Sequence, residues 1–267
     1  MKIVVITGST RGIGYGLADA FLDRGCSVTI SGRSEPRVHE AVSQLTQKHP
    51  IERIQGHPCD VTEQSQVQSL WDFAQKNYGS VDIWINNAGL SGDKKKIWEI
   101  LPKDAHEVLD TNIVGAVYGT QVAVLGMLDQ GFGAIYNMEG MGSDGRMHDG
   151  LSIYGTSKYA LKYFTDTLVL ETKETPIIIG ALRPGMVITD LVLNRYHGNP
   201  KELEKTKRIF NIIADTVENV TPWLADQILA NEKTGVRIKY ASTLKLLGRF
   251  LSAPFSKRDL FANLDLE

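Results

Sequence analysis

The chain has 267 residues, of which 42% are hydrophobic and 22% are charged, close to the averages of soluble globular proteins. This composition excludes a disordered, collagen-like or disulfide-scaffold protein. The formal net charge of −2 produces no overall field that would attract nucleic acid, so we expect no nucleic-acid partner.

Cysteine content and apolar segments indicate a cytoplasmic protein. The cysteines, Cys26 and Cys59, are too few for a disulfide framework, and we expect them near opposite ends of parallel strands, beyond disulfide reach. The first apolar run meets a glycine turn too early for a signal peptide. The charge-free stretch 111–128 is shorter than the ~20 apolar residues of a membrane span, and we expect it to be a buried helix.

Short apolar runs alternate with helical segments along the chain, which is the rhythm of βαβ units. Most runs are continuously apolar, as in parallel strands that helices cover on both faces. No linker or repeat interrupts the pattern. It therefore predicts an α/β fold, a doubly wound parallel sheet of about seven strands, in a single domain spanning 1–267. The predicted strands are 3–6, 28–31, 53–56, 81–85, 134–137, 177–182 and 236–239.

A glycine-rich turn stands between the first strand and a helix predicted over 15–23. Its glycines let the backbone approach a pyrophosphate, and the helix N-terminus supplies N–H groups and a positive dipole end. An ordinary turn is the alternative, but the place in the first βαβ unit favours a dinucleotide. The predicted contacts are Gly8, Ser9, Thr10, Arg11, Gly12, Ile13 and Gly14.

Arg33 ends the second strand about 20 residues after the glycines, where an NAD enzyme carries Asp or Glu. Arg33 and Arg11 can pair with a 2′-phosphate through charge-assisted hydrogen bonds. The sequence therefore predicts NADPH (NADP+) in preference to NADH. Two solvated surface arginines are the alternative.

Further loops follow strands at the same edge of the predicted sheet, where the rest of the cofactor should lie. Each of them could instead be an ordinary turn. The additional predicted cofactor contacts are Asp60, Val61, Asn87, Ala88, Gly89, Pro184, Gly185, Val187 and Thr189.

Tyr154 and Lys158 open a helix predicted to reach about 173, and their spacing of four places them on one face, beside the cofactor. A free tyrosine has a pKa of ~10, but a neighbouring ammonium and an oxidised nicotinamide favour the phenolate. Tyr154 can then exchange a proton with a carbonyl or alcohol oxygen. Asn112 supports this site, because Asn is a poor choice inside an apolar helix unless its side chain has a task. The alternatives are an exposed Tyr–Lys pair and a buried Asn that satisfies local backbone. No metal site is predicted.

These motifs together resemble the short-chain dehydrogenase/reductase family. The matching patterns are Thr-Gly-x-x-x-Gly-x-Gly at 7–14, Asn-Asn-Ala-Gly at 86–89, Asn112, Tyr-x-x-x-Lys at 154–158 and Pro-Gly at 184–185. The resemblance covers roughly 1–240 and implies a Rossmann-type sheet and a proton relay through Tyr154, Lys158 and Asn112. It also implies a helical substrate lid, for which the long segment 184–235 has room, and a homodimer or homotetramer with the 111–128 helix at its interface.

One departure from the family concerns the loop after the fifth strand. Most members carry Ser-Ser there, the second serine binding the substrate carbonyl, whereas Gly140 or Met141 falls at that place in this chain. Ser143, eleven residues before Tyr154, is the candidate to replace the serine. The alternative is that Tyr154 alone holds the oxygen.

The segments 137–146, 184–191 and 210–218 resemble chlorophyll(ide) b reductases, which use NADPH to reduce a formyl group to hydroxymethyl. The resemblance implies an NADPH-dependent carbonyl reductase acting on an aldehyde or ketone of a bulky, planar, lipophilic small molecule, such as a chlorophyllide. The alternatives are a generic ketone, steroid or 3-oxoacyl reductase and, from another class, a catalytically weak NADP-binding regulatory protein.

The tail 240–267 combines basic and apolar residues, and we expect it to pack over the domain edge or on a dimer partner. A membrane-surface helix is the alternative. Its apolar residues before Arg258 include Leu244, Leu246, Leu247, Phe250, Leu251 and Phe255.

Overall fold

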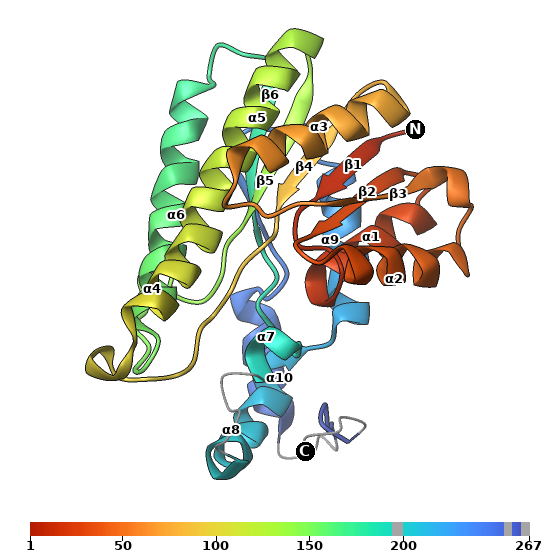
Figure 1. Cartoon of the computed structure of the whole chain (residues 1–267). Coiled ribbons are helices and arrows are strands. Elements are labelled where there is room, and N and C mark those ends of the chain that lie inside the picture. Colours follow the sequence, from red (N-terminus) through yellow and green to blue (C-terminus); the bar gives the residue numbers. More distant parts are fainter. Residues whose placement is uncertain (194–199, 254–257, 263–267) are drawn as a thin grey trace.

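The computed structural model describes residues 1–193, 200–253 and 258–262. Within these residues, seven parallel strands form one sheet in the order β3-β2-β1-β4-β5-β6-β9 (Figure 1). The order runs outward from β1 in both directions, so the carboxyl ends of β1 and β4 form the switch point where α/β sheets bind ligands. The strands are β1 Ile3–Ile6, β2 Ser27–Gly32, β3 Ile54–Pro58, β4 Ile83–Asn86, β5 Gly133–Met138, β6 Ile177–Arg183 and β9 Val236–Lys239.

The predicted doubly wound sheet is confirmed, with small shifts at strand ends. β3 begins one residue later than expected because Ile51–Arg53 form a short 3-10 turn. Both cysteines are buried free thiols.

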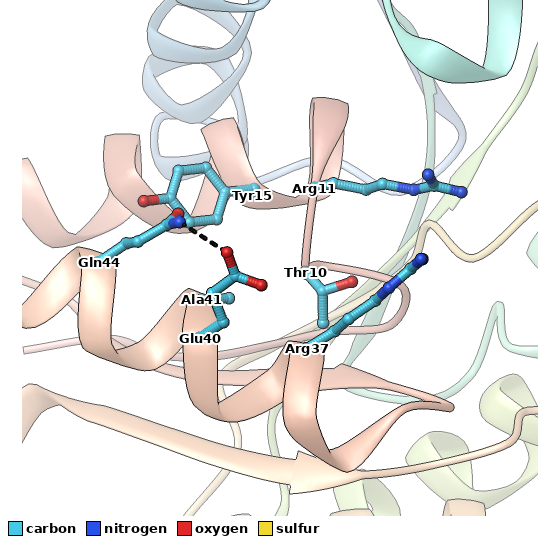
Figure 2. A pocket seen from close by; sticks show the side chains of 7 residues that line it. All are labelled: Thr10, Arg11, Tyr15, Arg37, Glu40, Ala41 and Gln44. Carbon is cyan, nitrogen blue, oxygen red and sulfur yellow. Dashed lines mark hydrogen bonds between the residues drawn. The ribbon is translucent and has the colours of Figure 1, made fainter.

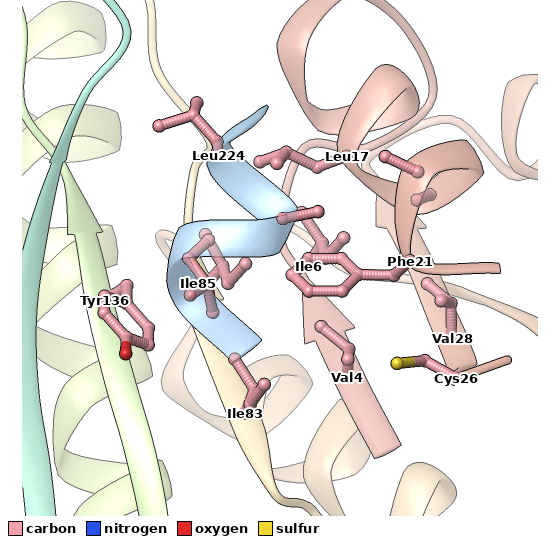
Figure 3. Close-up of a cluster of buried hydrophobic side chains, with 14 of the residues drawn as sticks. Val4, Ile6, Leu17, Phe21, Cys26, Val28, Ile83, Ile85, Tyr136 and Leu224 are labelled. Carbon is pink, nitrogen blue, oxygen red and sulfur yellow. The ribbon is translucent and has the colours of Figure 1, made fainter. Parts of the chain in front are cut away.

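Helices cover both faces of the sheet, which explains the continuously apolar strands. Ile6 and Ile85 belong to a buried cluster that includes Phe21 and Leu224 (Figure 3), while Val5 and Trp84 belong to a second cluster. The first cluster lies under α1 Gly12–Asp23, α2 Glu35–Thr46 and α9 Val217–Leu229. The second lies under α3 Gln64–Tyr78, α5 Gly115–Gln130 and α6 Ser152–Glu171.

The helix expected over 111–128 is longer than predicted and is interrupted. It comprises α4 (Pro102–Leu109), a π-helical turn (Asp110–Val114) and α5. By length and composition alone, Pro102–Gln130 is the one helical stretch among the described residues that could cross a membrane, and half of its most apolar window is buried in the fold. Its packing over the sheet supports the expected core helix.

The segment after β6 forms a small layer at the carboxyl edge of the sheet. β7 (Met186–Val187) pairs in parallel with β8 (Ala214–Asp215), and α7 (Asp190–Leu193) and α8 (Pro200–Ile213) accompany them (Figure 1). The last part of 184–235, the segment of the predicted lid, is α9, which packs on α1 and belongs to the sheet's helical cover because its apolar face is buried there.

The C-terminal helix α10 (Thr243–Ser252) packs on α8. This agrees with the expected packing of the tail over the domain edge. Leu247, Phe250 and Leu251 remain exposed. The side chain of Leu244 and the whole of Phe255 lie outside the described residues.

Candidate active site

The glycine turn and the loop after β4 are held against each other. The Thr7 hydroxyl accepts hydrogen bonds from the backbone N–H groups of Asn87 (3.0 Å) and Ala88 (3.1 Å). The Asn87 amide in turn donates to the carbonyls of Thr7 and Gly8, both at 2.9 Å. A Cβ on Gly8, which has a φ of 61°, would lie 2.7 Å from the Ala88 Cα, so only glycine allows this approach. Two loops predicted to bind the cofactor therefore form one rigid unit.

The N-terminus of α1 is suited to an anion. Among the described residues, no side chain caps this end through a hydrogen bond, and the first turn contains no acidic residue. Its N–H groups and positive dipole end therefore remain available to a phosphate. This agrees with the predicted pyrophosphate site.

The side chain of Ser9, a predicted cofactor contact, holds the glycine turn in place. Its hydroxyl is fully buried, donates to the Ile6 carbonyl at 2.7 Å and accepts from the Ser31 N–H at 2.9 Å. These bonds fasten the turn to β2, and the contact of Ser9 with the cofactor stays a prediction.

A cavity of about 310 Å³ lies beside the glycine turn, between α1 and α2 (Figure 2). Figure 2 shows the side chains of Arg11 and Arg37 extending to the same side, with Thr10 between their backbones. Sequence reasoning missed Arg37, although it lies only four residues after Arg33, in the first turn of α2. The lining residues are Thr10, Arg11, Tyr15, Arg37, Glu40, Ala41 and Gln44.

Arg33 does not line this cavity, and both predicted phosphate-binding arginines have acidic partners. Arg11 pairs with Asp190 at 3.0 Å and Arg33 with Glu107 at 3.5 Å, all four side chains being more than half exposed. Such surface pairs contribute only about 0–1 kcal/mol, so a phosphate can displace them.

Tyr154 and Lys158 are both buried on α6. The Lys158 Nζ donates to the Met138 carbonyl at 3.0 Å and lies 5.9 Å from the centroid of the Tyr154 ring. A Cβ on Gly89 would be 3.5 Å from this Nζ. The structure therefore brings Tyr154, Lys158 and the loop after β4 together at the sheet's switch point.

Asn112 lies in the π-helical turn, a feature frequent at functional sites. Its Oδ1 accepts from the Leu90 N–H at 2.7 Å, and its Nδ2 donates to the Leu90 carbonyl (2.8 Å) and the Ser157 Oγ (2.9 Å). The side chain thus connects the loop after β4 to α6. Its part in a proton relay stays a prediction.

Of the two residues at which the family serine was expected, Gly140 and Met141, Gly140 lies against Tyr154. A Cβ there would lie 2.5 Å from the Tyr154 hydroxyl oxygen. Ser143 is buried, and its N–H donates to the Gly140 carbonyl at 3.1 Å, which closes a tight turn. This turn connects Ser143 to Gly140, which lies against Tyr154. The role of Ser143 stays a prediction.

Glu139 forms a buried ion network that sequence reasoning missed. It accepts hydrogen bonds from Arg183 and, at 3.0 Å, from the Nε of Arg237. Arg183 also donates to the Ser143 carbonyl at 3.4 Å. A carboxylate at the end of a buried strand requires such partners. The position of Glu139 directly after an apolar strand could therefore have predicted a buried ion pair. The network holds the loop beside Tyr154.

A second cavity, of about 230 Å³, adjoins Tyr154. Apolar side chains, among them Leu90, Val108 and Ile153, share its wall with Asp93, Lys95, Asp104 and Glu107. It offers a carbonyl group access to the Tyr154 side chain.

The remaining predicted contacts lie at the same edge. Val61 is buried against Gly115, and Asp60 accepts hydrogen bonds from Thr62. Thr189 lies beside the glycine turn, since a Cβ on Gly12 would be 3.6 Å from its methyl group. The structure thus gathers the loops after β3, β4 and β6 around the turn.

The fold, the glycine turn and the Tyr154–Lys158 pair define a dinucleotide-dependent oxidoreductase. The chain belongs to the short-chain dehydrogenase family, whose family model matches residues 2–199. This confirms the resemblance seen in the motifs.

Two curated plant proteins are similar to this chain. The identity is 37% over 237 residues with the chlorophyll(ide) b reductase NOL of Arabidopsis thaliana, covering 87% of this chain and 66% of the relative. It is 33% over 260 residues with the probable chlorophyll(ide) b reductase NYC1 of the same plant, covering 91% and 51%. The chain thus spans between about half and two thirds of their lengths.

Among solved structures, a variant of actinorhodin polyketide ketoreductase crystallised with NADPH superposes with a TM-score of 0.81. The two chains are 24% identical, and the match covers 91% of this chain and 97% of the other. This likeness confirms the fold.

Proposed function

We propose that the protein is an NADPH-dependent carbonyl reductase that converts an aldehyde or ketone into an alcohol. The observation that carries the proposal is the buried Tyr154–Lys158 pair: Tyr154 lines a cavity, and Lys158 lies beside Gly89 in the loop after β4. A module that only binds dinucleotides needs no such proton-transfer pair. The class of regulatory protein considered above is therefore less well supported.

Each residue of the site has a task in this reaction. A bound nicotinamide supplies a hydride for the carbonyl carbon. The Tyr154 hydroxyl delivers a proton to the carbonyl oxygen, and the nearby Lys158 ammonium stabilises the phenolate that remains. Lys158 is held in place by the Met138 carbonyl, and α6 is held by the bond between Asn112 and Ser157. The sheet edge therefore fixes the proton donor before substrate arrives.

The charges around the glycine turn support NADPH over NADH. Arg11 and Arg37 line the cavity beside the turn, and Arg33 follows β2. Guanidinium groups make strong, often bidentate, hydrogen bonds to phosphate oxygens. The pyrophosphate would lie at the uncapped N-terminus of α1 and the 2′-phosphate among these arginines.

The proposed substrate is a planar, lipophilic aldehyde of the chlorophyll(ide) b type. The support is the activity named for the two plant relatives and the exposed apolar residues near the cavity at Tyr154. Trp98 and Met147 are 79% and 96% exposed, and their loops are joined by the bond from the Lys95 N–H to the Gly150 carbonyl. The formyl arm would enter the cavity while the ring system lies against this apolar rim.

Incubation with chlorophyllide b and NADPH tests the proposal. We expect the absorption bands of chlorophyllide b to be replaced by those of the hydroxymethyl product. One NADPH should be oxidised for each pigment molecule reduced. Tyr154→Phe should retain NADPH binding and lose turnover by about 10²–10⁴-fold. Turnover of ketones, steroids or acyl thioesters without pigment turnover would support the generic reductase, and NADPH binding without any turnover would support the regulatory protein.

Oligomerisation is proposed through the outer faces of α5 and α6. Leu125 on α5 and Tyr159, Tyr163 and Leu170 on α6 are exposed apolar or aromatic residues, which soluble monomers rarely group together. We propose a homodimer or homotetramer, and light scattering of wild type and of Tyr163→Glu would test it. A monomeric wild type would refute it.

The cytosol is the proposed location, because both thiols are free and buried, as suits a reducing compartment. The plant relatives carry the word chloroplastic in their names, so a plastid is the alternative. Fractionation of cells that produce the natural protein decides between them.

A further inference from the structure

Asp215, at the end of β8, is a buried carboxylate with side-chain partners from α9, from α10 and from the segments that follow β9 and α10. Only 3% of its surface is exposed. Its Oδ1 accepts from the Asn219 amide at 3.0 Å and from Arg258 at 2.7 Å. Its Oδ2 accepts from the Tyr240 hydroxyl at 2.8 Å and from Arg249. Arg249 and Arg258 both come from the C-terminal tail, beyond the residues that the family model matches.

The same two arginines also bind the backbone around β8. Arg249 donates to the Ala214 carbonyl at 3.1 Å, and Arg258 donates to it at 2.8 Å. Their side chains are about three quarters buried. The basic charge of this part of the tail is therefore used inside the fold rather than on its surface.

β8 is the partner strand of β7, in a segment that carries predicted cofactor contacts. Val187 pairs with Asp215, and the Ile188 N–H donates to the Asp215 carbonyl at 3.0 Å. Thr189, the next residue, is the one that lies beside Gly12. Asp215 thus binds the tail through its side chain and the segment with the predicted cofactor contacts Val187 and Thr189 through its backbone.

Apolar packing extends the same connection. Phe261 is buried with Ile188 and Val192 in one cluster, where it stacks on Phe210 with ring centroids 6.2 Å apart. The Tyr240 N–H also donates to the Arg183 carbonyl at 3.0 Å, directly before Pro184 and Gly185. The tail therefore contacts the segment 183–192 at both ends.

We propose that Arg249 and Arg258 are positioning residues which, through Asp215, hold the segment 184–189 in the shape that receives the nicotinamide end of the cofactor. The inference rests on the proposed NADPH site. Removing one arginine leaves the negative charge of the buried Asp215 carboxylate only partly balanced. We therefore expect β8 and its partner strand β7 to shift. The cavity between α1 and α2, which would hold the adenosine end with its 2′-phosphate, is not lined by Arg249 or Arg258 in the described part of the chain and should keep its shape.

The experiment compares two ligands in the full chain with Arg249→Met and Arg258→Met. NADPH probes the whole cofactor site, whereas 2′,5′-ADP probes the adenosine and phosphate end alone. We expect the Kd for NADPH to rise about tenfold in each variant, equivalent to about 1.4 kcal/mol, while the Kd for 2′,5′-ADP stays within about twofold. Arg249→Lys should recover part of the loss, because an ammonium keeps the charge but not the forked geometry.

Arg24→Met is the matched control. Arg24 also pairs with an aspartate, Asp226, and is largely buried, but it lies between α1 and α9 away from the tail. We expect no change in the Kd for either ligand. An effect equal to that of Arg249→Met would show a general loss of stability and overturn the proposal.

The results separate this inference from the proposed function. An unchanged Kd for NADPH in both tail variants, with a wild type that binds NADPH, overturns the positioning role alone. A wild type that binds neither ligand overturns the proposed NADPH site. Parallel weakening of both ligands also overturns the positioning role, and if Arg249→Met does not fold, Arg258→Met and Arg249→Lys give the same comparison.

Discussion

Gly140 lies directly against the hydroxyl group of Tyr154, so that a Cβ on residue 140 would be 2.5 Å from the phenolic oxygen. Real side chains do not approach so closely, and either Tyr154 or the loop would have to move. Tyr154 is itself buried, which limits its freedom to move. Glycine at residue 140 therefore keeps the space around the Tyr154 hydroxyl open.

Gly140→Ala should lower kcat/KM for an aldehyde by about tenfold or more, because displacing the phenol misplaces the proton donor. The Kd for NADPH should change little. Gly155→Ala, one residue after Tyr154, is the matched control, since a Cβ there meets no atom within 4 Å among the described residues. Equal activity of both variants would contradict the interpretation.

Ser143→Ala tests whether that hydroxyl replaces the missing family serine. We expect kcat/KM to fall about tenfold, the loss of one hydrogen bond to the carbonyl oxygen, at an unchanged Kd for NADPH. Ser65→Ala, on the exposed side of α3, is the control. An unchanged kcat/KM would remove Ser143 from the mechanism and leave Tyr154 as the sole holder of the oxygen.

Arg33→Ala and Arg37→Ala should each raise the Kd for NADPH about tenfold, because each removes a charge-assisted hydrogen bond to the 2′-phosphate. NADH has no such phosphate, so its Kd should stay within about twofold. Both constants are measurable by the fluorescence of the bound cofactor. Arg146→Ala, on a loop away from α2, serves as control, and equal effects on NADPH and NADH would argue against a 2′-phosphate site.

The stability of the layer around β8 should depend on acid pH. Burial alone would raise the pKa of Asp215, but hydrogen bonds from Arg249, Asn219 and Tyr240 outweigh it and lower the pKa to about 2. Because an unfolded aspartate has a pKa of ~3.9, the carboxylate stabilises the fold by about 2 kcal/mol above pH ~5, and this is lost as pH falls toward 2.

Urea unfolding of wild type and Asp215→Asn measures this contribution. The difference in free energy of unfolding should be constant between pH 7 and pH 5 and smaller at pH 3. Asp226→Asn is the control: the hydrogen bond from Arg24 also lowers the pKa of Asp226, but its side chain is 58% exposed. A difference for Asp215→Asn that grows toward low pH would contradict the expected sign.

Local pattern was sufficient for the sheet and for the core of the site. Strands such as β1 are apolar at every position because both faces are covered, and this is visible along the chain itself. The glycine turn and the Tyr154–Lys158 spacing are also local, since one turn and one helix face define them. Asn112 stood out by its polarity, but only the hydrogen bonds of the folded chain revealed the π-helical turn around it.

The sequence by itself thus determined the fold class and the family and predicted the Tyr154–Lys158 pair, because each depends on short motifs whose residues are neighbours in the chain or on one helix face. Tertiary structure decided the rest. Arg37 joins Arg11 beside one cavity, Glu139 meets Arg183 and Arg237, and Asp215 gathers the tail arginines. The physical reason is that a buried charge must be paired, whereas the partner that satisfies it is chosen by the packing of elements distant in sequence.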